Sequence, residues 1–354
     1  MKTKKQLFGV LCDGTEVNLF TISNGKMSVS CTELGATLTS IVLEKKNGKT
    51  IDVLYGHSTL DGYIKSTSFF GCIVGRFANR IGNASFTLEE KKYKLDKNDK
   101  ENTLHGGFDG YHKKVWKGSL VKEENYVGVK FTRLSPDGEQ GMPGNVKLEV
   151  YYLLDNNNNL TCYYTAKTDK ATPINITNHA YFNLAGNGKI LNHTLKMNSK
   201  YILEVRKGLI PTGKFINVEN TPFDFTTEKS LGKDIKKIKI GGYDHCYVTE
   251  KYNLEDKNCG CPLEDSDLVE FCKLKELEND VEMQVFTNME GCQLYTGNGL
   301  HGVIGKNGVK YRKHGAVCLE TQCFPDTPNI SEFPSCVLEP GKTMKAKTIY
   351  SFNF

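Results

Sequence analysis

The fold class follows from the stretch Val146-Lys-Leu-Glu-Val-Tyr-Tyr-Leu-Leu-Asp155-Asn-Asn-Asn-Asn-Leu160-Thr-Cys-Tyr-Tyr-Thr-Ala166. On both sides of its centre, apolar residues alternate with more polar ones: Val146, Leu148, Val150, Tyr152 and Leu154, then Leu160, Cys162, Tyr164 and Ala166. A period of two is typical of a half-buried strand. Asp155 and the four asparagines after it fit the tip of a hairpin that is lengthened by a low-complexity insert. The stretch therefore predicts two antiparallel strands.

The same alternation recurs far from this hairpin, as in Met27, Val29 and Cys31 or in Val281, Met283 and Val285. Dipeptides that favour tight turns stand between such runs: Asn24-Gly25, Asn47-Gly48, Asp137-Gly138, Asn187-Gly188 and Asn307-Gly308. Helical periodicity is scarce, and its best candidate, Leu263 to Leu277, is expected in a surface excursion over residues 252–282. No Pro/Ser-rich linker divides the chain. We expect one domain over residues 1–354, all-β, a single large antiparallel β-sandwich.

Composition excludes several classes of protein. The 354 residues are 38% hydrophobic and 25% charged, which is typical of a globular protein. The net charge of +5 arises from 46 basic and 41 acidic residues, and the lysines are scattered, so the electrostatic footprint of a nucleic-acid-binding protein is missing. No run approaches the roughly 18 apolar residues of a membrane span, and the N-terminus lacks the apolar core of a signal peptide. A cytoplasmic location is the expectation.

The twelve cysteines do not suggest a disulfide framework. Most lie in apolar runs, as Cys72 and Cys318 do, and are expected to be small buried hydrophobic residues. The closest pair, Cys259-Gly260-Cys261, lacks both the two-residue spacer and the second pair of a zinc site. We therefore expect no metal.

Six segments place hydrogen-bonding side chains in apolar, strand-like context, which is costly unless those groups have partners or a function. They are Phe69–Ile81 with Arg76, Asn79 and Arg80, Asn102–Phe108 with His105, Ile174–Leu184 with Asn178 and His179, Gly241–His245 with Asp244, Met289–Asn298 with Gln293, and Gly315–Gln322 with Glu320. Four of them also have a structural interpretation: a buried ion pair for the arginines, a structural histidine at His105, a plain turn at Asp244, and an exposed acid at the end of a strand for Glu320.

Together these segments resemble the aldose 1-epimerase (galactose mutarotase) family, and the motifs follow one another in order. They are Gly-Arg-Phe-Ala-Asn79-Arg80-Ile, Asn-Thr-Leu-His105-Gly-Gly, Asp137-Gly-Glu-Gln-Gly-Met-Pro-Gly, Asn178-His179-Ala-Tyr-Phe-Asn-Leu, Asp244-His, Gln293-Leu-Tyr-Thr-Gly-Asn and Leu-Glu320-Thr-Gln. The resemblance implies a large antiparallel β-sandwich, no cofactor or metal, and interconversion of the α and β anomers of free hexoses such as galactose and glucose.

The resemblance also assigns roles to residues. It makes His179 the general acid and Glu320 the general base, and it makes Asn79, Arg80, His105, Asp244 and Gln293 binders of sugar hydroxyls. The expected partner is a small-molecule hexose, and the chain is expected to be a monomer or a homodimer. Glutamate has a reference pKa of about 4.3 and should be ionised at neutral pH, whereas histidine, near 6.5, needs a carboxylate nearby to stay protonated. Asp244 is the candidate for that support.

The chain departs from the family pattern at Pro325-Asp326-Thr-Pro-Asn329-Ile330, where a histidine is common at the last position, and between residues 252 and 282. Other functions also stay open. One is a non-catalytic carbohydrate-binding protein on the same fold, and another is a hexose-6-phosphate epimerase. A glycoside hydrolase is a third, although most of those enzymes use two carboxylates.

Overall fold

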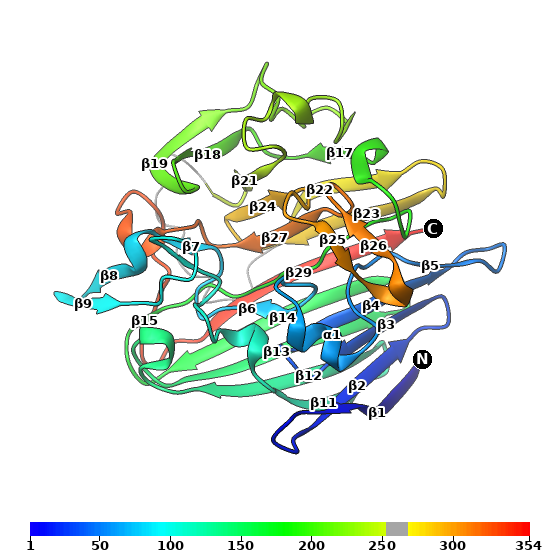
Figure 1. Cartoon of the computed structure of the whole chain (residues 1–354), viewed down its shortest axis with the longest axis horizontal. Coiled ribbons are helices and arrows are strands. Elements are labelled where there is room, and N and C mark those ends of the chain that lie inside the picture. The colour runs from blue at the N-terminus through cyan, green and yellow to red at the C-terminus, as the bar shows by residue number, and fades with distance from the viewer. Residues whose placement is uncertain (253–267) are drawn as a thin grey trace.

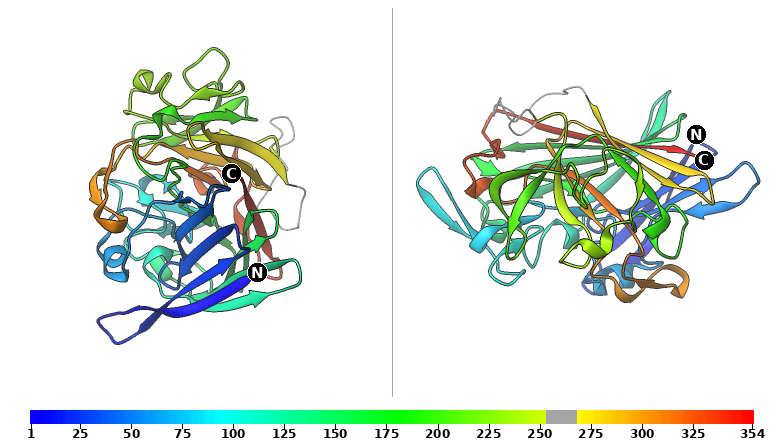
Figure 2. Two further views of the ribbon diagram at one scale, coloured as in Figure 1. Left: turned by 90° about the vertical axis from the view of Figure 1, so that its right-hand side faces the viewer. Right: turned by 90° about the horizontal axis from the view of Figure 1, so that it is seen from above.

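A nine-stranded antiparallel sheet is the largest element of the computed structural model, which describes residues 1–252 and 268–354 (Figure 1). In spatial order it contains β11 (Lys117–Lys122), β12 (Tyr126–Ser135), β13 (Val146–Asp155), β14 (Asn159–Thr168), β29 (Met344–Asn353), β23 (Val281–Thr287), β22 (Val269–Glu276), β17 (Thr194–Met197) and β20 (Lys229–Ser230). Seen from above, its green, yellow and red strands form one layer, and β25 (His301–Ile304) and β26 (Lys310–Arg312) lie on the other side of the molecule (Figure 2).

Two five-stranded antiparallel sheets complete the framework. One is β1 (Lys2–Val10), β2 (Glu16–Ser23), β3 (Met27–Thr32), β4 (Thr37–Glu44) and β5 (Thr50–Asp52). The other is β19 (Ile210–Asn217), β18 (Tyr201–Arg206), β21 (Asp244–Val248), β24 (Gly291–Tyr295) and β27 (Cys318–Gln322). One hydrophobic core joins all three sheets through residues such as Phe20, Tyr152 and Leu294. The predicted large antiparallel β-sandwich is confirmed.

The hairpin of β13 and β14 forms where the sequence predicts it. Tyr152 and Leu154 are fully buried, and the intervening residues of β13 are more exposed. The asparagines do not lengthen the loop, because Asn159 already belongs to β14. The Asp155 carboxylate closes the turn by accepting hydrogen bonds from the backbone N–H groups of Asn157 (2.8 Å) and Asn159 (2.9 Å).

The β13 strand also reaches the functional part of the molecule. The hydroxyl of Tyr152 donates to the carbonyl of Ala36 (2.7 Å) and accepts from Nδ2 of Asn178 (2.9 Å), which also donates to the carbonyl of Gly71 (2.6 Å). Asn178 ends the short strand β16 (Thr177–Asn178), which pairs with β6 (Ile73–Val74). The large sheet therefore fixes the segment that carries His179.

The expectation of a surface excursion over residues 252–282 is wrong for its second half. β22 lies within the nine-stranded sheet between β17 and β23, and its Phe271 and Leu274 are fully buried. The helical candidate at Leu263 to Leu277 is equally wrong over residues 269–276. Residues 253–267, which include the Cys259 and Cys261 pair, lie outside the described residues.

The described cysteines fit the sequence expectation. Ten lie in the described ranges, all are free thiols, and all but Cys12 are buried.

None of the helices in the described ranges is long and apolar enough to span a bilayer. The α-helix α1 (Leu60–Lys65) is short.

Candidate active site

All seven predicted site residues line one cavity of about 230 Å³. The residues that share it are Asn79, Arg80, His105, His179, Asp244, Gln293 and Glu320. They come from the start of β7 (Arg80–Ile81), the loop after β10 (Thr103–Leu104), the end of β16, and the strands β21, β24 and β27. The cavity thus gathers side chains from β7, β21, β24 and β27, strands near the middle of the molecule (Figure 1).

The pairing of β27 determines which residues lie next to Glu320. β27 pairs with β24 so that Glu320 lies directly opposite Gln293. On the other side of β27, Phe182 and Val317 exchange two backbone hydrogen bonds of 2.8 Å each. This isolated bridge brings the segment that carries His179 alongside β27. The resulting distance between His179 Nε2 and Glu320 Oε1 is 3.6 Å.

Burial controls the protonation of this pair, whose side chains are 5% and 3% exposed. Burial lowers the pKa of His179 to about 3. Burial, reinforced by the charge of Asp244, raises the pKa of Glu320 well above its usual value, and Arg80 lowers it. These shifts favour the neutral form of each side chain, because a low-dielectric site penalises the charged form. The reference pKa behind the expectation of an ionised Glu320 does not include this effect.

Asp244 does not support His179 in the way that the sequence suggested. Its Oδ1 accepts a hydrogen bond from Nε2 of Gln293 (2.6 Å). The charge of Asp244 acts on Glu320, and the neighbouring charge that acts on His179 is that of His112, which lowers the pKa of His179. Burial raises the pKa of Asp244, whereas Arg80 and Gln293 lower it. Asp244 and Gln293 form a hydrogen-bonded unit across β21 and β24.

His105 is fixed in one tautomer. Its Nδ1 accepts a hydrogen bond from the backbone N–H of Asn79 (3.1 Å), and burial lowers its pKa well below the usual value. A neutral imidazole that accepts at Nδ1 carries its proton on Nε2. His105 therefore offers an N–H donor through Nε2.

The donor set does not favour a bound metal. Ligand atoms of His105, His179 and Glu320 lie within 4.8 Å of one another, which would suit a divalent cation. The free lone pair of His105, however, is already engaged by the Asn79 N–H. A metal would have to break that hydrogen bond or remove the Nε2 proton, because a coordinating histidine must present an unprotonated nitrogen.

The two arginines of the Phe69–Ile81 segment have different roles. Arg76 is 3% exposed and donates to Ser135 Oγ (2.6 Å) and to the carbonyls of Pro143 (2.6 Å) and Gly144 (3.0 Å), so its role is structural. Arg80 lines the cavity, and its Nε donates to Asp99 Oδ2 (2.8 Å). That ion pair orients the guanidinium and leaves its terminal nitrogens available to a ligand.

Aromatic residues that the sequence analysis did not select surround His179. The Tyr181 ring stacks on the imidazole at a centroid distance of 4.8 Å and an angle of 9°, and Phe69 does so at 5.7 Å and 14°. Tyr295 meets the imidazole edge-on at 6.4 Å. Tyr181 could have been found, because a residue two positions from His179 faces the same side of an extended segment. Phe69 lies in a loop and carries no such signal.

Comparison with known proteins agrees with this arrangement. The family model for aldose 1-epimerase matches residues 18–351. The chain is 37% identical over 353 residues to galactose mutarotase of Mus musculus, with 99% of this chain and 98% of that protein covered. It is 32% identical over 348 residues to aldose 1-epimerase of Escherichia coli K12, with 96% of each chain covered.

Solved structures give the same result. The galactose 1-epimerase from Lactobacillus acidophilus NCFM superposes with a TM-score of 0.84 at 27% identity, over 99% of this chain and 98% of that one. The aldose epimerase homologue from C. elegans superposes with a TM-score of 0.85 at 28% identity, over 94% and 98% of the two chains. Sequence and fold together show that the chain belongs to the aldose 1-epimerase family.

Proposed function

We propose that this protein is an aldose 1-epimerase that interconverts the α and β anomers of free hexoses, with galactose and glucose as the substrates to test first. The observation that carries the proposal is the buried His179 and Glu320 pair, at 3.6 Å, in a cavity whose other polar groups can bind hydroxyls. Arg80 and His105 offer donors, and Asp244 offers a carboxylate acceptor. One chain supplies the whole set, so a monomer would suffice.

The reaction needs two proton transfers. Glu320 as a carboxylate takes the proton of the O1 hydroxyl, the bond between C1 and O5 breaks, and the His179 imidazolium gives a proton to O5. The product is an open-chain aldehyde, whose C1–C2 bond can rotate. Ring closure on the other face of the carbonyl returns both protons by the reverse transfers, so the pair ends as it began.

The electrostatics of the cavity support this cycle. The neutral forms of His179 and Glu320 hold the same number of protons as the ion pair, so one form becomes the other by a single transfer between them. Once the sugar ring has opened, Glu320 has gained a proton and His179 has lost one, so both residues are neutral. Burial, which lowers the pKa of His179 and raises that of Glu320, therefore favours the ring-opening transfers.

The cavity does not favour a phosphorylated sugar. Of the described residues that line it, Arg80 is the one lysine or arginine, and it is already paired with Asp99. Asp244 and Glu320 contribute carboxyl groups to the same wall. A phosphate normally needs several donors or a surplus of positive charge, so a free hexose is the better substrate.

The free thiols in the described ranges support a further part of the proposal, a cytoplasmic location. Cysteines persist as thiols in reducing compartments, whereas secreted proteins tend to form disulfides. Fractionation of the source cells would test it, and recovery of the protein outside the cytoplasm would contradict it.

Polarimetry of freshly dissolved α-D-galactose and α-D-glucose tests the enzyme. The native protein should speed the approach to anomeric equilibrium, and Glu320→Gln and His179→Asn should each lose about 10²- to 10⁴-fold of that acceleration. Glu278→Gln and His301→Asn, at exposed positions, are the matched controls and should keep it.

Three other results would identify the alternatives. A native protein that binds sugar but gives only the spontaneous rate would be a binding protein. Faster mutarotation of glucose 6-phosphate than of glucose would favour the phosphate epimerase. Methyl α-D-galactoside has no O1 proton to remove, so its release of galactose would reveal a glycoside hydrolase.

A further inference from the structure

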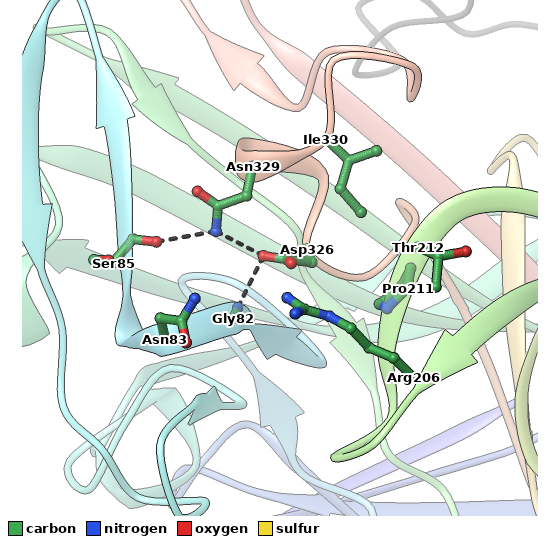
Figure 3. Close-up of a pocket in the computed structure, with 9 residues that line it drawn as sticks. All are labelled: Gly82, Asn83, Ser85, Arg206, Pro211, Thr212, Asp326, Asn329 and Ile330. Atoms are coloured by element: carbon green, nitrogen blue, oxygen red, sulfur yellow. Dashed lines mark hydrogen bonds between the residues drawn. The ribbon is translucent and has the colours of Figure 1, made fainter.

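A second cavity, of about 530 Å³, shares no lining residue with the candidate active site. Three segments form it: the turn between β7 and β8 (Ser85–Leu88), the hairpin of β18 and β19, and the 3₁₀ helix η7 (Thr327–Asn329) (Figure 3). It includes Ile330, the position at which this chain departs from the family pattern. Its volume lies in the range of about 300–1,000 Å³ that is usual for small-molecule sites.

A buried carboxylate occupies one wall of this second cavity. Asp326 is 3% exposed, and its Oδ1 accepts hydrogen bonds from the Gly82 N–H (2.8 Å) and from Asn329 Nδ2 (2.7 Å). A Cβ atom at position 82 would lie 2.9 Å from Oδ2 of Asp326, so the glycine at this position leaves room for that oxygen. Within the described ranges, Oδ2 accepts no hydrogen bond, and it is available to a ligand.

A guanidinium faces this carboxylate without pairing to it. Arg206, at the end of β18, reaches toward Asp326 across the cavity (Figure 3). Among the residues that the structure describes, no ion pair within 4.0 Å involves Arg206. The two charges nevertheless act on each other, since burial raises the pKa of Asp326 and Arg206 lowers it. Opposite charges held apart by a cavity leave space for a group that bonds to both.

The remaining walls indicate the class of ligand. Asn83, Ser85, Thr212 and Asn329 add amides and hydroxyls, which both donate and accept, and Pro211 and Ile330 add apolar surface. The lining carries one positive and one negative charge, so it favours a neutral ligand over a phosphate. A carboxylate accepts from sugar hydroxyls and a guanidinium donates to two neighbouring hydroxyl oxygens, while the C–H face of the ring can pack on Ile330.

We propose that this cavity is a second carbohydrate site, which binds a neutral sugar ring between Asp326 and Arg206 and lies apart from the catalytic pair. The proposal goes beyond the anomer exchange assigned to the first cavity, and it would hold even if that activity were absent.

Methyl NMR can observe both cavities in one titration. Protein labelled with ¹³C in the methyl groups of isoleucine and leucine carries Ile330 as the probe of the second cavity, and Leu104 and Leu300 as probes of the first. D-galactose is added to the native protein, to Arg206→Gln, and to Arg312→Gln, a matched exposed arginine on β26. Polarimetry of the same samples measures catalysis.

We expect the Ile330 signal of the native protein to shift and saturate with a dissociation constant different from that of Leu104 and Leu300. Arg206→Gln should weaken the Ile330 response by about tenfold or more, because it removes hydrogen bonds from a charged donor. It should leave the leucine responses and the mutarotation rate unchanged. Arg312→Gln should alter none of them.

Several results would overturn the proposal. One is an Ile330 signal that stays in place while Leu104 and Leu300 respond. Another is an Ile330 response that is equal in the native protein and in Arg206→Gln. A parallel titration with glycine tests a zwitterion in place of a sugar. If glycine shifts Ile330 through Arg206 and galactose does not, the site binds an amino acid.

Discussion

At the scale of single residues, the environment of His179 differs from that of a typical catalytic histidine. Its Nδ1 is buried and donates to no other residue in the described ranges, so the usual orienting carboxylate is missing. The rings of Tyr181 and Phe69 stack on the imidazole instead. Aromatic faces attract cations. The stacking can therefore orient the ring and offset part of the cost of protonating it.

This argument predicts the effect of Phe69→Leu. Loss of one aromatic face should destabilise the imidazolium by about 0.5–2 kcal/mol and lower kcat by about 2- to 30-fold. KM should change little, because Leu keeps an apolar cavity wall, and the pKa of His179 should fall in a ¹³C or ¹⁵N titration. Phe8→Leu, whose ring contacts Tyr63 away from His179, is the matched control. A rise in KM with unchanged kcat would show that Phe69 contacts the sugar instead.

At the scale of elements, the Asp155 side chain closes the turn of the β13 and β14 hairpin. The Asp155 carboxylate accepts from two backbone N–H groups and from Nδ2 of Asn159 (2.8 Å). Each such hydrogen bond is worth about 0.5–1.5 kcal/mol. Asp155→Ala should thus lower the free energy of unfolding by about 1.5–4.5 kcal/mol in urea titrations, with mutarotation unchanged at 25 °C.

Asp13→Ala is the control for this hairpin. The Asp13 carboxylate accepts a single backbone hydrogen bond, from Thr15 in an exposed turn, and its removal should cost less than 1 kcal/mol. Equal losses of stability in the two variants would show that Asp155 adds nothing specific to the β13–β14 hairpin.

β22 shows where sequence patterns fail. A β-bulge shifts its pairing with β23 between Glu270 and Cys272, so Phe271 and Cys272 are both buried. The bulge breaks the alternation and leaves Phe271 and Leu274 three residues apart, a spacing that imitates one face of a helix. In β13 no bulge interrupts the pairing, so the alternation is intact and the sequence predicts the strand.

The candidate active site also has features that could be predicted from the sequence and features that could not. Its seven polar residues could be predicted, because each lies in a motif of the family that the chain resembles. The raised pKa of Glu320 and the position of Phe69 could not. Both depend on which distant segments exclude water from the cavity, and a local pattern does not contain that information.

At the scale of the whole molecule, stability should depend on one buried acid away from the catalytic pair. Glu290 precedes β24, is 3% exposed, and has an Oε1 without a partner in the described ranges. Burial raises its pKa to about 7. In the unfolded chain a glutamate has a pKa of about 4.3. Between these values the folded protein holds a proton that the unfolded chain has released, so stability falls as pH rises toward 7 and then levels off.

Glu290→Gln should remove this dependence, because the amide cannot ionise. Relative to the native protein, the variant should gain on the order of 3 kcal/mol between pH 5 and pH 8, measured as the change with pH in the difference between their free energies of unfolding in urea. Any constant cost of a buried amide cancels in that comparison, as do the groups that titrate in both proteins. Glu278→Gln, at an exposed position, should show no such gain. A difference that stays constant from pH 5 to pH 8 would mean that Glu290 ionises as readily in the folded protein as in water.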